Sequence, residues 1–288
     1  MKKVLVTGGL GFVGSTLVKK LKQEGDYDIT VIDNLSSPSS NASYKEEGVK
    51  YIIDDILNID NVFYNDLNFD IIYHLAGLAR IQPSFKNPVK YFFNNTFGTV
   101  KICDLARRCN AKIIYAGSSS AYSGTMNSPY AYAKYNGEEI CKLFSKLYDM
   151  SAVTARFFNV YGNRQPVEGK FATVIGIFER QYKNKEPLTV VGDGEQRRDF
   201  THVNDIVNGL VELSKGEYQG EIYNLGTGRN YSINQLVEFF MSDSVNIPLR
   251  PGEARLSIAD ISKTKNDLDW EPTRSLREYI KQFKSKVK

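Results

Sequence analysis

Tyr130 and Lys134 are a pair of side chains well suited to proton transfer. Because positions four apart share one face of a helix, the phenol and the ammonium can converge. A free phenol titrates near 10, so a phenolate base at neutral pH needs its pKa lowered by about 3 units, roughly 4 kcal/mol of differential stabilisation. A neighbouring positive charge favours the phenolate. The pair therefore predicts general acid–base chemistry, although the same spacing is common on solvent-exposed helices.

A glycine-rich segment near the amino terminus predicts a dinucleotide site. The strand-like run 4–6 breaks into glycines, and Gly9-x-Gly11-x-x-Gly14 leads into a helical pattern. Such glycines allow the backbone to approach a pyrophosphate at a helix amino terminus. Asp33 follows at about the spacing of an acid that binds the adenosine ribose, and it would repel a 2′-phosphate. The segment predicts NAD rather than NADP, and this context favours a catalytic Tyr130 over a surface one.

The elements that must position these groups alternate between strand and helix. The predicted strands cover residues 4–6, 28–32, 50–53, 70–73, 112–115 and 153–157. Helices are expected between them, including 88–109 and 129–148. This alternation predicts an α/β fold with a doubly wound parallel sheet of the Rossmann type, whose ligands bind at the carboxyl ends of the strands.

The pattern loosens after residue 160, which predicts two domains. We expect an NAD-binding domain at 1–160 and a smaller α/β substrate domain at 161–288. The second contains a predicted helix at 171–182, a strand at 188–191, and the capping box Ser232-x-x-Gln235. The strand-like segment 221–225 is a candidate to return to the main sheet.

Composition points to a protein that handles a small ligand. The formal charge is +4 and no Lys/Arg run resembles a nucleic-acid-binding tract. Cys103, Cys109 and Cys141 lie in apolar helical patterns, which indicates reduced thiols and a cytoplasmic location. We expect no membrane span, and no signal peptide because the chain enters its first strand at once.

Ordered motifs continue along nearly the whole chain. They are Thr7–Gly14, Asp33–Ser37, Asp55-Ile56, His74–Gly77, Asn95-x-x-Gly98-Thr99, Ser118–Ser120, Tyr130-x-x-x-Lys134, Arg156–Gly162, Gly192–Gly194 with Arg198–Phe200, Asn224–Gly228 and Arg250–Glu253. Together they resemble the extended short-chain dehydrogenases/reductases, specifically the NAD-dependent nucleotide-sugar epimerases and dehydratases. The similarity is greatest to the UDP-hexose 4-epimerases.

The resemblance implies a set of residues that bind NAD. The glycines would hold the pyrophosphate, Asp33 the adenosine ribose, and Lys134 the nicotinamide ribose. Asp55 and Ile56 would flank the adenine. The full implied set is Gly8, Gly11, Phe12, Val13, Gly14, Asp33, Asn34, Asp55, Ile56, Leu75, Ala76, Gly77, Asn95, Tyr130 and Lys134.

The resemblance also implies a UDP-sugar substrate and a 4-epimerase reaction. Tyr130 would take the proton of the sugar 4-hydroxyl, Ser118 would bind that oxygen, and Lys134 would complete the catalytic set. The resulting 4-keto sugar would turn over and accept hydride on its other face. The implied substrate-binding residues are Ser118, Asn159, Arg198, Arg250, Glu253 and Ser257.

Ser257 falls where related epimerases place a residue beside the sugar C2 substituent. A serine there implies that UDP-GlcNAc and UDP-GalNAc fit as well as UDP-glucose and UDP-galactose. The alternative is that Ser257 faces solvent and that the short loop at 123–129 sets the size limit.

Other activities remain open at this stage. Dehydratases and decarboxylases of the resembling family carry acids directly after the catalytic Ser/Thr, where this chain has Ser119 and Ser120. A dehydratase, a decarboxylase, a reductase and a catalytically inactive dinucleotide sensor are the alternatives to the epimerase.

Two further expectations concern metals and assembly. His74 and His202 occupy packing positions, and no cluster has metal-ligand spacing, so no metal is expected. The apolar faces of helices 88–109 and 129–148 resemble those that form a four-helix interface in the family, which implies a twofold homodimer.

Overall fold

A seven-stranded parallel sheet forms the centre of the computed structural model, which describes residues 1–37, 39–64 and 68–287. The strand order is β3-β2-β1-β4-β5-β6-β9, and every neighbouring pair is parallel. The doubly wound prediction is therefore confirmed. The strands are β1 (Lys2–Thr7), β2 (Tyr27–Ile32), β3 (Lys50–Ile52), β4 (Ile71–His74), β5 (Lys112–Ser118), β6 (Ala152–Phe157) and β9 (Gln219–Leu225).

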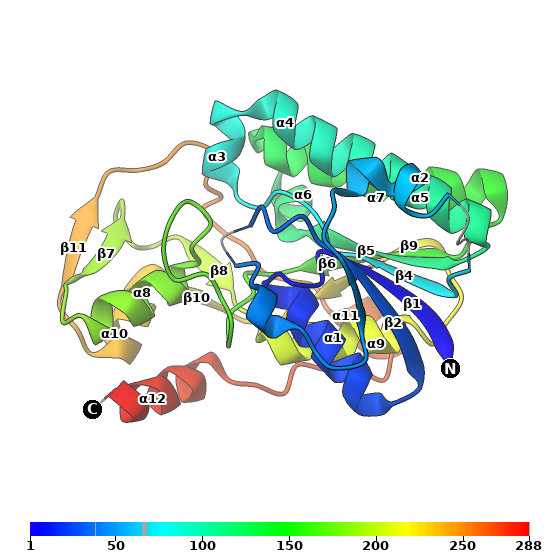
Figure 1. The fold of residues 1–288 in the computed structure, drawn as a ribbon. Helices are drawn as coiled ribbons and strands as arrows, with labels where there is room; N and C mark the ends of the chain where they lie inside the picture. Colours follow the sequence, from blue (N-terminus) through cyan, green and yellow to red (C-terminus); the bar gives the residue numbers. More distant parts are fainter. Residues whose placement is uncertain (38, 65–67, 288) are drawn as a thin grey trace.

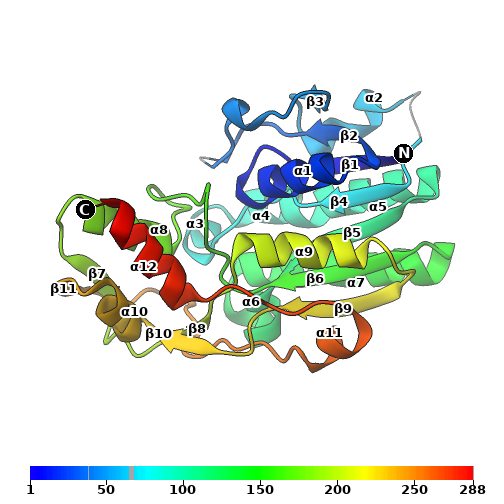
Figure 2. The same cartoon turned by 90° about the horizontal axis from the view of Figure 1, so that it is seen from below.

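Helices cover both faces of this sheet (Figures 1 and 2). On one face, α1 (Phe12–Glu24) and α9 (Val203–Leu213) pack side by side over a buried apolar cluster. On the other, α5 (Gly98–Cys109) and α7 (Pro129–Tyr148) cover a second cluster that includes the buried thiols of Cys103 and Cys141. Both faces are apolar because a parallel sheet is buried on both sides.

The helix expected at 88–109 is interrupted. It consists of α4 (Pro88–Phe92), a π-helical turn η3 (Phe93–Phe97) and α5. The turn rotates Asn95 inward, where the side chain is buried. Such π turns often occur at functional sites, and hydrophobic spacing alone does not reveal them.

A second lobe lies at the left in Figure 1 and has its own apolar cluster around Phe178 and Phe240. The predicted capping box is confirmed, since Ser232 and Gln235 each accept a hydrogen bond from the other's backbone N–H. The pairing of β11 beside β7 had no counterpart in the sequence prediction. The elements are α8 (Val174–Lys183), β7 (Leu188–Val191), β8 (Arg197–Asp199), β10 (Asn230–Ser232), α10 (Ile233–Phe240), β11 (Ser244–Ile247) and α12 (Leu276–Val287).

The chain crosses back to the main sheet after it first enters the second lobe. Helix α9 packs beside α1, and β9 adds to the sheet edge beside β6. Helix α11 (Ser262–Asp267) is tied to β9 by a hydrogen bond from Thr264 to the Asn224 carbonyl. Short segments complete the fold: η1 (Ala42–Tyr44), η2 (Ile56–Asn58), α2 (Ile59–Val62), α3 (Ile81–Lys86), α6 (Ser119–Ser123) and η4 (Thr125–Asn127).

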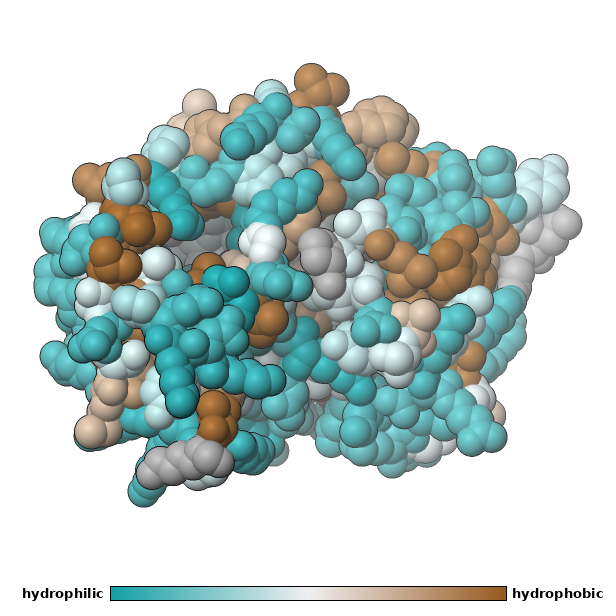
Figure 3. Space-filling model, turned by 60° about the vertical axis from the view of Figure 1, so that its left-hand side comes forward, coloured by the Kyte–Doolittle hydropathy of each residue, from teal (hydrophilic) through white to brown (hydrophobic). Residues whose placement is uncertain are grey.

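The surface seen in Figure 3 is mostly hydrophilic, with separate hydrophobic patches. Within the described ranges, none of the helices combines the length and the apolar character needed to cross a membrane. The same ranges contain no group of three His, Cys, Asp or Glu side chains arranged to hold a metal ion.

Candidate active site

A cavity of about 1050 Å³ opens at the carboxyl ends of the strands, between the sheet and the second lobe. Its volume is at the upper end of ordinary ligand pockets, as two ligands would require. It brings together residues that are far apart in the sequence. The predicted site residues that line it are Gly8, Gly11, Phe12, Val13, Gly14, Asp33, Asn34, Ile56, Leu75, Ala76, Gly77, Ser118, Tyr130, Lys134, Asn159, Arg198, Arg250, Glu253 and Ser257.

The glycine loop leaves room for a pyrophosphate at the start of α1. Gly8 has a φ of +71°, and a Cβ there would lie 2.9 Å from the Ala76 nitrogen. A Cβ on Gly14 would collide with the Gly8 carbonyl oxygen. Phe12 begins α1, and the unpaired N–H groups of a first helical turn attract phosphate. The loop therefore fits NAD.

Asp33 lies at the mouth of this loop, where an adenosine ribose would bind. Its two carboxylate oxygens accept backbone N–H bonds from Leu10 at 2.9 Å and from Leu35 at 2.8 Å. Each oxygen keeps a lone pair for a ribose hydroxyl. The two backbone N–H groups of Leu10 and Leu35 therefore orient the Asp33 carboxylate toward the cavity.

Two of the implied cofactor residues, Asp55 and Asn95, are not among the residues that line the cavity. Asp55 accepts hydrogen bonds from Leu57 N at 2.9 Å and from Asn34 Nδ2 at 2.7 Å. Asp54, which the sequence did not suggest, lines the cavity instead. Asp55 thereby positions Asn34, which itself faces the cavity.

Asn95 is the other. Its Oδ1 accepts the Leu78 N–H at 2.7 Å, and its Nδ2 donates to the Leu78 carbonyl at 2.9 Å. The buried amide therefore pins the segment that follows β4. It is also close behind the cavity wall, since a Cβ on Gly77 would lie 3.3 Å from Asn95 Oδ1.

Ser118 and Tyr130 meet at the carboxyl end of β5. The Tyr130 hydroxyl donates to Ser118 Oγ at 3.3 Å, and Ser118 Oγ lies 2.8 Å from Ser120 Oγ. Ser118 ends β5 and caps α6, while Ser128 caps α7 through its bond to the Ala131 N–H. The starts of α6 and α7 therefore bring the Ser118 and Tyr130 hydroxyls together.

Lys134 bonds the backbone of β5 with its ammonium group. Its Nζ donates to the Ala116 carbonyl at 2.8 Å and lies 4.8 Å from the centre of the Tyr115 ring. The convergence of the Lys134 ammonium with the Tyr130 hydroxyl stays a prediction, and the structure adds a bond from the same ammonium to the end of β5. Burial lowers the pKa of Lys134 to about 8.

The surroundings of Tyr130 raise the pKa of its phenol. Burial is the largest cause, while the hydrogen bond with Ser118 and the positive charge of Arg80 act in the opposite direction. Arg80 lines the same cavity, and sequence reasoning missed it. Its position within six residues of the His74–Gly77 motif was the available signal.

The residues predicted to bind substrate line the same cavity. Arg198 Nη2 lies 3.8 Å from Glu253 Oε2, and the Arg198 side chain is 15% exposed. Asn159 Nδ2 donates to the Asp199 carbonyl at 2.9 Å. Ser257 is 6% exposed and lines the cavity, and its Oγ has no hydrogen-bond partner among the described residues. Ser257 therefore does not face bulk solvent, as the alternative required.

Both histidines have structural partners. His74 is buried between the Thr7 and Thr99 hydroxyls, at 2.9 and 3.1 Å. His202 caps α9 by accepting the Asn204 N–H. Burial lowers the pKa of His74 to about 3 and that of His202 to about 4. Both rings are therefore neutral and hold packing positions.

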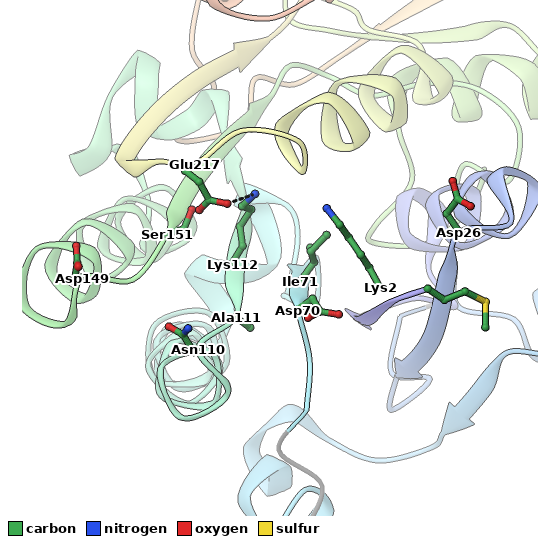
Figure 4. Close-up of a pocket in the computed structure, with 11 residues that line it drawn as sticks. Lys2, Asp26, Asp70, Ile71, Asn110, Ala111, Lys112, Asp149, Ser151 and Glu217 are labelled. Atoms are coloured by element: carbon green, nitrogen blue, oxygen red, sulfur yellow. Dashed lines mark ion pairs between the residues drawn. The ribbon is translucent and has the colours of Figure 1, made fainter.

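A second hollow of about 740 Å³ lies at the opposite end of the strands (Figure 4). Three of its charged groups are paired within the protein: Lys112 bonds Glu217 at 3.0 Å and the Ser214 carbonyl at 2.9 Å, and Asp70 accepts the Lys3 N–H. Ligands of parallel α/β sheets bind at the carboxyl ends, so this hollow is not the candidate site.

Residues 4–226 match the model of the NAD dependent epimerase/dehydratase family. The chain belongs to this family. NAD is the cofactor of the family, which confirms at that level the prediction of NAD from the glycine loop. The members combine a Rossmann-type sheet with a nucleotide-sugar substrate, and the match covers every strand of the main sheet beyond the first two residues of β1.

Individual members show more than one activity. A putative UDP-glucose 4-epimerase of Methanocaldococcus jannaschii is 35% identical over 96% of both chains. UDP-glucuronic acid decarboxylase 2 of Arabidopsis thaliana is 32% identical over 99% of this chain and 69% of that protein. The UDP-glucose 4-epimerase of Thermotoga maritima, solved with UDP-glucose, superposes with a TM-score of 0.91 at 30% identity, covering 99% of this chain and all of that one.

Proposed function

We propose that this family member is a UDP-hexose 4-epimerase that uses tightly bound NAD. The observation that carries the proposal is the Ser118–Tyr130 contact of 3.3 Å at the end of β5, next to a glycine loop that fits NAD. A sensor that only binds a dinucleotide has no need for this pair. The contact supports a site built for proton transfer from a sugar hydroxyl.

In the proposed reaction the sugar C4 hydroxyl lies between the two protein hydroxyls. Tyr130 takes its proton, Ser118 binds the same oxygen, and Tyr130 returns the proton when C4 has inverted. Bound NAD supplies the acceptor for the C4 hydride. Lys134, buried beside Gly77, would hold the ribose on the sugar side of the cofactor.

Ser119 and Ser120 favour epimerisation over the other reactions of the family. Both line the cavity directly after Ser118. Removal of a hydroxyl requires an acid that protonates the leaving oxygen, and neither serine can supply one at neutral pH. Lys134 and Arg80, which line the same cavity, are both cations and cannot protonate a leaving hydroxyl as a carboxylic acid would.

The substrate diphosphate is proposed to bind Arg198 and Arg250, with Asn159 and Glu253 beside it. Two guanidiniums suit a diphosphate because each presents several donors in one plane. Burial lowers the pKa of Arg198, so an anion at this partly dehydrated charge is strongly favoured. Ser257 would then lie beside the sugar, where its small side chain leaves room for an acetamido group.

Proton NMR of the purified protein with single UDP-sugars tests the proposal. UDP-glucose, UDP-galactose, UDP-GlcNAc and UDP-GalNAc should each invert at C4, with no net formation of NADH, because the borrowed hydride is returned. The protein should carry NAD(H) as purified and prefer it over NADP, because of Asp33. A pentose product from UDP-glucuronic acid, a 4-keto-6-deoxy sugar, or dinucleotide binding without any turnover would each refute the epimerase assignment.

We also propose a twofold homodimer. Large apolar side chains stand exposed on α4, η3 and α7, which is unusual for a surface that faces only water. They are Val89 at 79%, Phe93 at 54%, Phe97 at 45%, Leu143 at 51% and Leu147 at 61% exposure. An interface around a twofold axis uses the same surface patch on both subunits, and the exposed apolar face of these helices would form that patch.

A further inference from the structure

We propose that Asp199 is a positioning residue that holds the substrate-binding side chains in place relative to the NAD-binding sheet. This role rests on the proposed function, which assigns Asn159, Arg198 and Ser257 to the substrate. Asp199 ends β8, is 0% exposed and does not line the cavity. It therefore acts through its neighbours and not on the ligand itself.

The alternation of side chains along β8 separates Asp199 from the cavity. Successive side chains of a strand face opposite sides. Gln196, Arg198 and Phe200 line the cavity, whereas Arg197 and Asp199 do not. A carboxylate anchored on the far side of the strand thus directs the adjacent Arg198 guanidinium toward the substrate.

The Asp199 carboxylate joins three segments of the chain. It accepts the Thr227 N–H at 2.9 Å and the Thr227 hydroxyl at 2.6 Å, in the segment that follows β9. It also accepts the Gly228 N–H at 3.0 Å and the Ala259 N–H at 3.1 Å. Since β9 belongs to the main sheet and Ala259 comes two residues after Ser257, this carboxylate ties β8 and the Ser257 segment to the sheet edge.

The backbone of Asp199 holds two of the substrate residues directly. Its N–H donates to the Ser257 carbonyl at 3.0 Å, and its carbonyl accepts the Asn159 Nδ2 at 2.9 Å. The Ser257 N–H in turn donates to the Arg197 carbonyl at 3.0 Å. Asn159 has a φ of +27°, which is strained for a residue with a side chain and needs such a restraint. A displaced Asp199 would therefore move Asn159 and Ser257 together.

The surroundings of the carboxylate are tightly packed. A Cβ on Gly226 would collide with the Ala259 Cβ and would lie 3.1 Å from Asp199 Oδ2. Burial raises the pKa of Asp199, while the bonds from Thr227, Ala259 and Gly228 act in the opposite direction. Buried N–H groups that lose their acceptor are costly. Without the carboxylate, these segments would separate until water reached the N–H groups.

Asp199→Asn tests the proposal with UDP, a probe that needs no turnover. Asparagine keeps the shape of the side chain, but its NH2 group cannot accept from the N–H groups that Asp199 binds. Isothermal titration calorimetry of the NAD-loaded protein should give a Kd for UDP at least about tenfold above wild type. With UDP-galactose, KM should rise by a similar factor while kcat changes by less than about threefold. A role in stability alone would instead lower the fraction of active protein, and hence the apparent kcat, at an unchanged KM.

Thr227 offers a second pair of variants that leave Asp199 in place, in case Asp199→Asn does not fold. Thr227→Val removes the hydroxyl that donates to Asp199 and keeps the branched shape. It should raise the Kd for UDP by about threefold or more, whereas Thr227→Ser retains the hydroxyl and should bind UDP like wild type. Thr227 does not line the cavity, so the difference between the two variants cannot arise from direct contact with UDP.

Asp205→Asn is the matched control. Asp205 is 1% exposed, and its carboxylate accepts the Arg274 N–H at 3.0 Å and the Thr273 hydroxyl at 3.0 Å. It does not line the cavity, and these partners are not substrate-binding residues. The variant should lower Tm and leave both the Kd for UDP and the KM for UDP-galactose unchanged.

Two results would overturn the proposal. One is wild-type affinity for UDP in Asp199→Asn or in Thr227→Val, whatever happens to Tm, which would limit this cluster to a stabilising role. The other is an equal loss of affinity in Asp205→Asn, which would mean that any broken buried bond disturbs the site. Weakened UDP binding in Asp199→Asn, in a protein that shows no epimerase turnover, would refute the proposed function and leave the Asp199 assignment standing.

Discussion

The Nζ of Lys134 lies 2.8 Å from the carbonyl oxygen of Ala116, two residues before Ser118 on the same strand. This bond joins α7 to the end of β5 beneath the site where the two hydroxyls meet. Tyr130 reaches Ser118, while the lysine that shares its helix face lines the cavity and bonds the strand backbone. The lysine is therefore a buried cation that would face the cofactor.

Tyr130→Phe removes the proton-transfer oxygen and keeps the ring against Tyr91. Turnover should fall by about 10²–10⁴-fold, the usual contribution of a positioned acid–base group, while the fold and NAD binding persist. Steady-state kinetics with UDP-galactose and the circular dichroism spectrum measure the two effects. Tyr132→Phe, two residues along the same helix and 38% exposed, is the control and should retain activity. If the Tyr130→Phe variant kept wild-type rates, Tyr130 would have no role in proton transfer.

Lys134→Met should reveal a pH-dependent contribution to stability in the NAD-free protein. The pKa of Lys134 is about 8 when folded, below the value of about 10.4 in an unfolded chain, so the unfolded state binds more protons between these values. The charged lysine is therefore a penalty on folding below pH 8, and the penalty declines as the pH rises.

Urea unfolding of both proteins at pH 7.5 and 9.5 measures this. The stability of wild type relative to Lys134→Met should increase by about 2 kcal/mol between the two values. Comparison with the variant cancels the titration of all other groups. An equal stability difference at both pH values would show that Lys134 keeps an ordinary pKa.

Ser257→Tyr should separate substrates by size. Since Ser257 is buried in the cavity wall, a tyrosine there would overfill the space proposed for an acetamido group. Activity on UDP-GlcNAc and UDP-GalNAc should be abolished selectively, with the plain hexoses largely unaffected. The ratio of kcat/KM for the two classes is the measurement, and Ser257→Ala is the control that keeps the space open. Equal losses in both classes would show that this position does not gate the sugar.

Sedimentation at micromolar concentration should give a dimer. The double variant Leu143→Glu, Leu147→Glu places charges on the exposed face of α7 and should yield a folded monomer, because burying two carboxylates in an apolar interface is unfavourable. Met241→Glu, on a side chain 83% exposed in the second lobe, is the control and should stay dimeric. Wild-type protein that sediments only as a monomer would contradict the prediction.

The sequence by itself determined the sheet, the glycine loop and the helix that carries Tyr130. Each depends on local rules: β-branched runs form strands, Gly8 has a positive φ and a Cβ on Gly14 would collide with the Gly8 carbonyl, and Ser128 with Pro129 begins α7. Such signals are contained within a few neighbouring residues, so they could be recognised before any contact was known.

Tertiary structure alone decided which way the polar side chains point. Helical spacing places Lys134 and Tyr130 on one helix face, but only the structure shows that the Lys134 ammonium donates to the Ala116 carbonyl of β5. The π turn directs the Asn95 amide to the backbone of Leu78, and Arg80 Nε bonds the Phe171 carbonyl from the other side of the cavity. These outcomes depend on competition between partners as far as 91 residues apart, such as Arg80 and Phe171, and no local pattern records that competition.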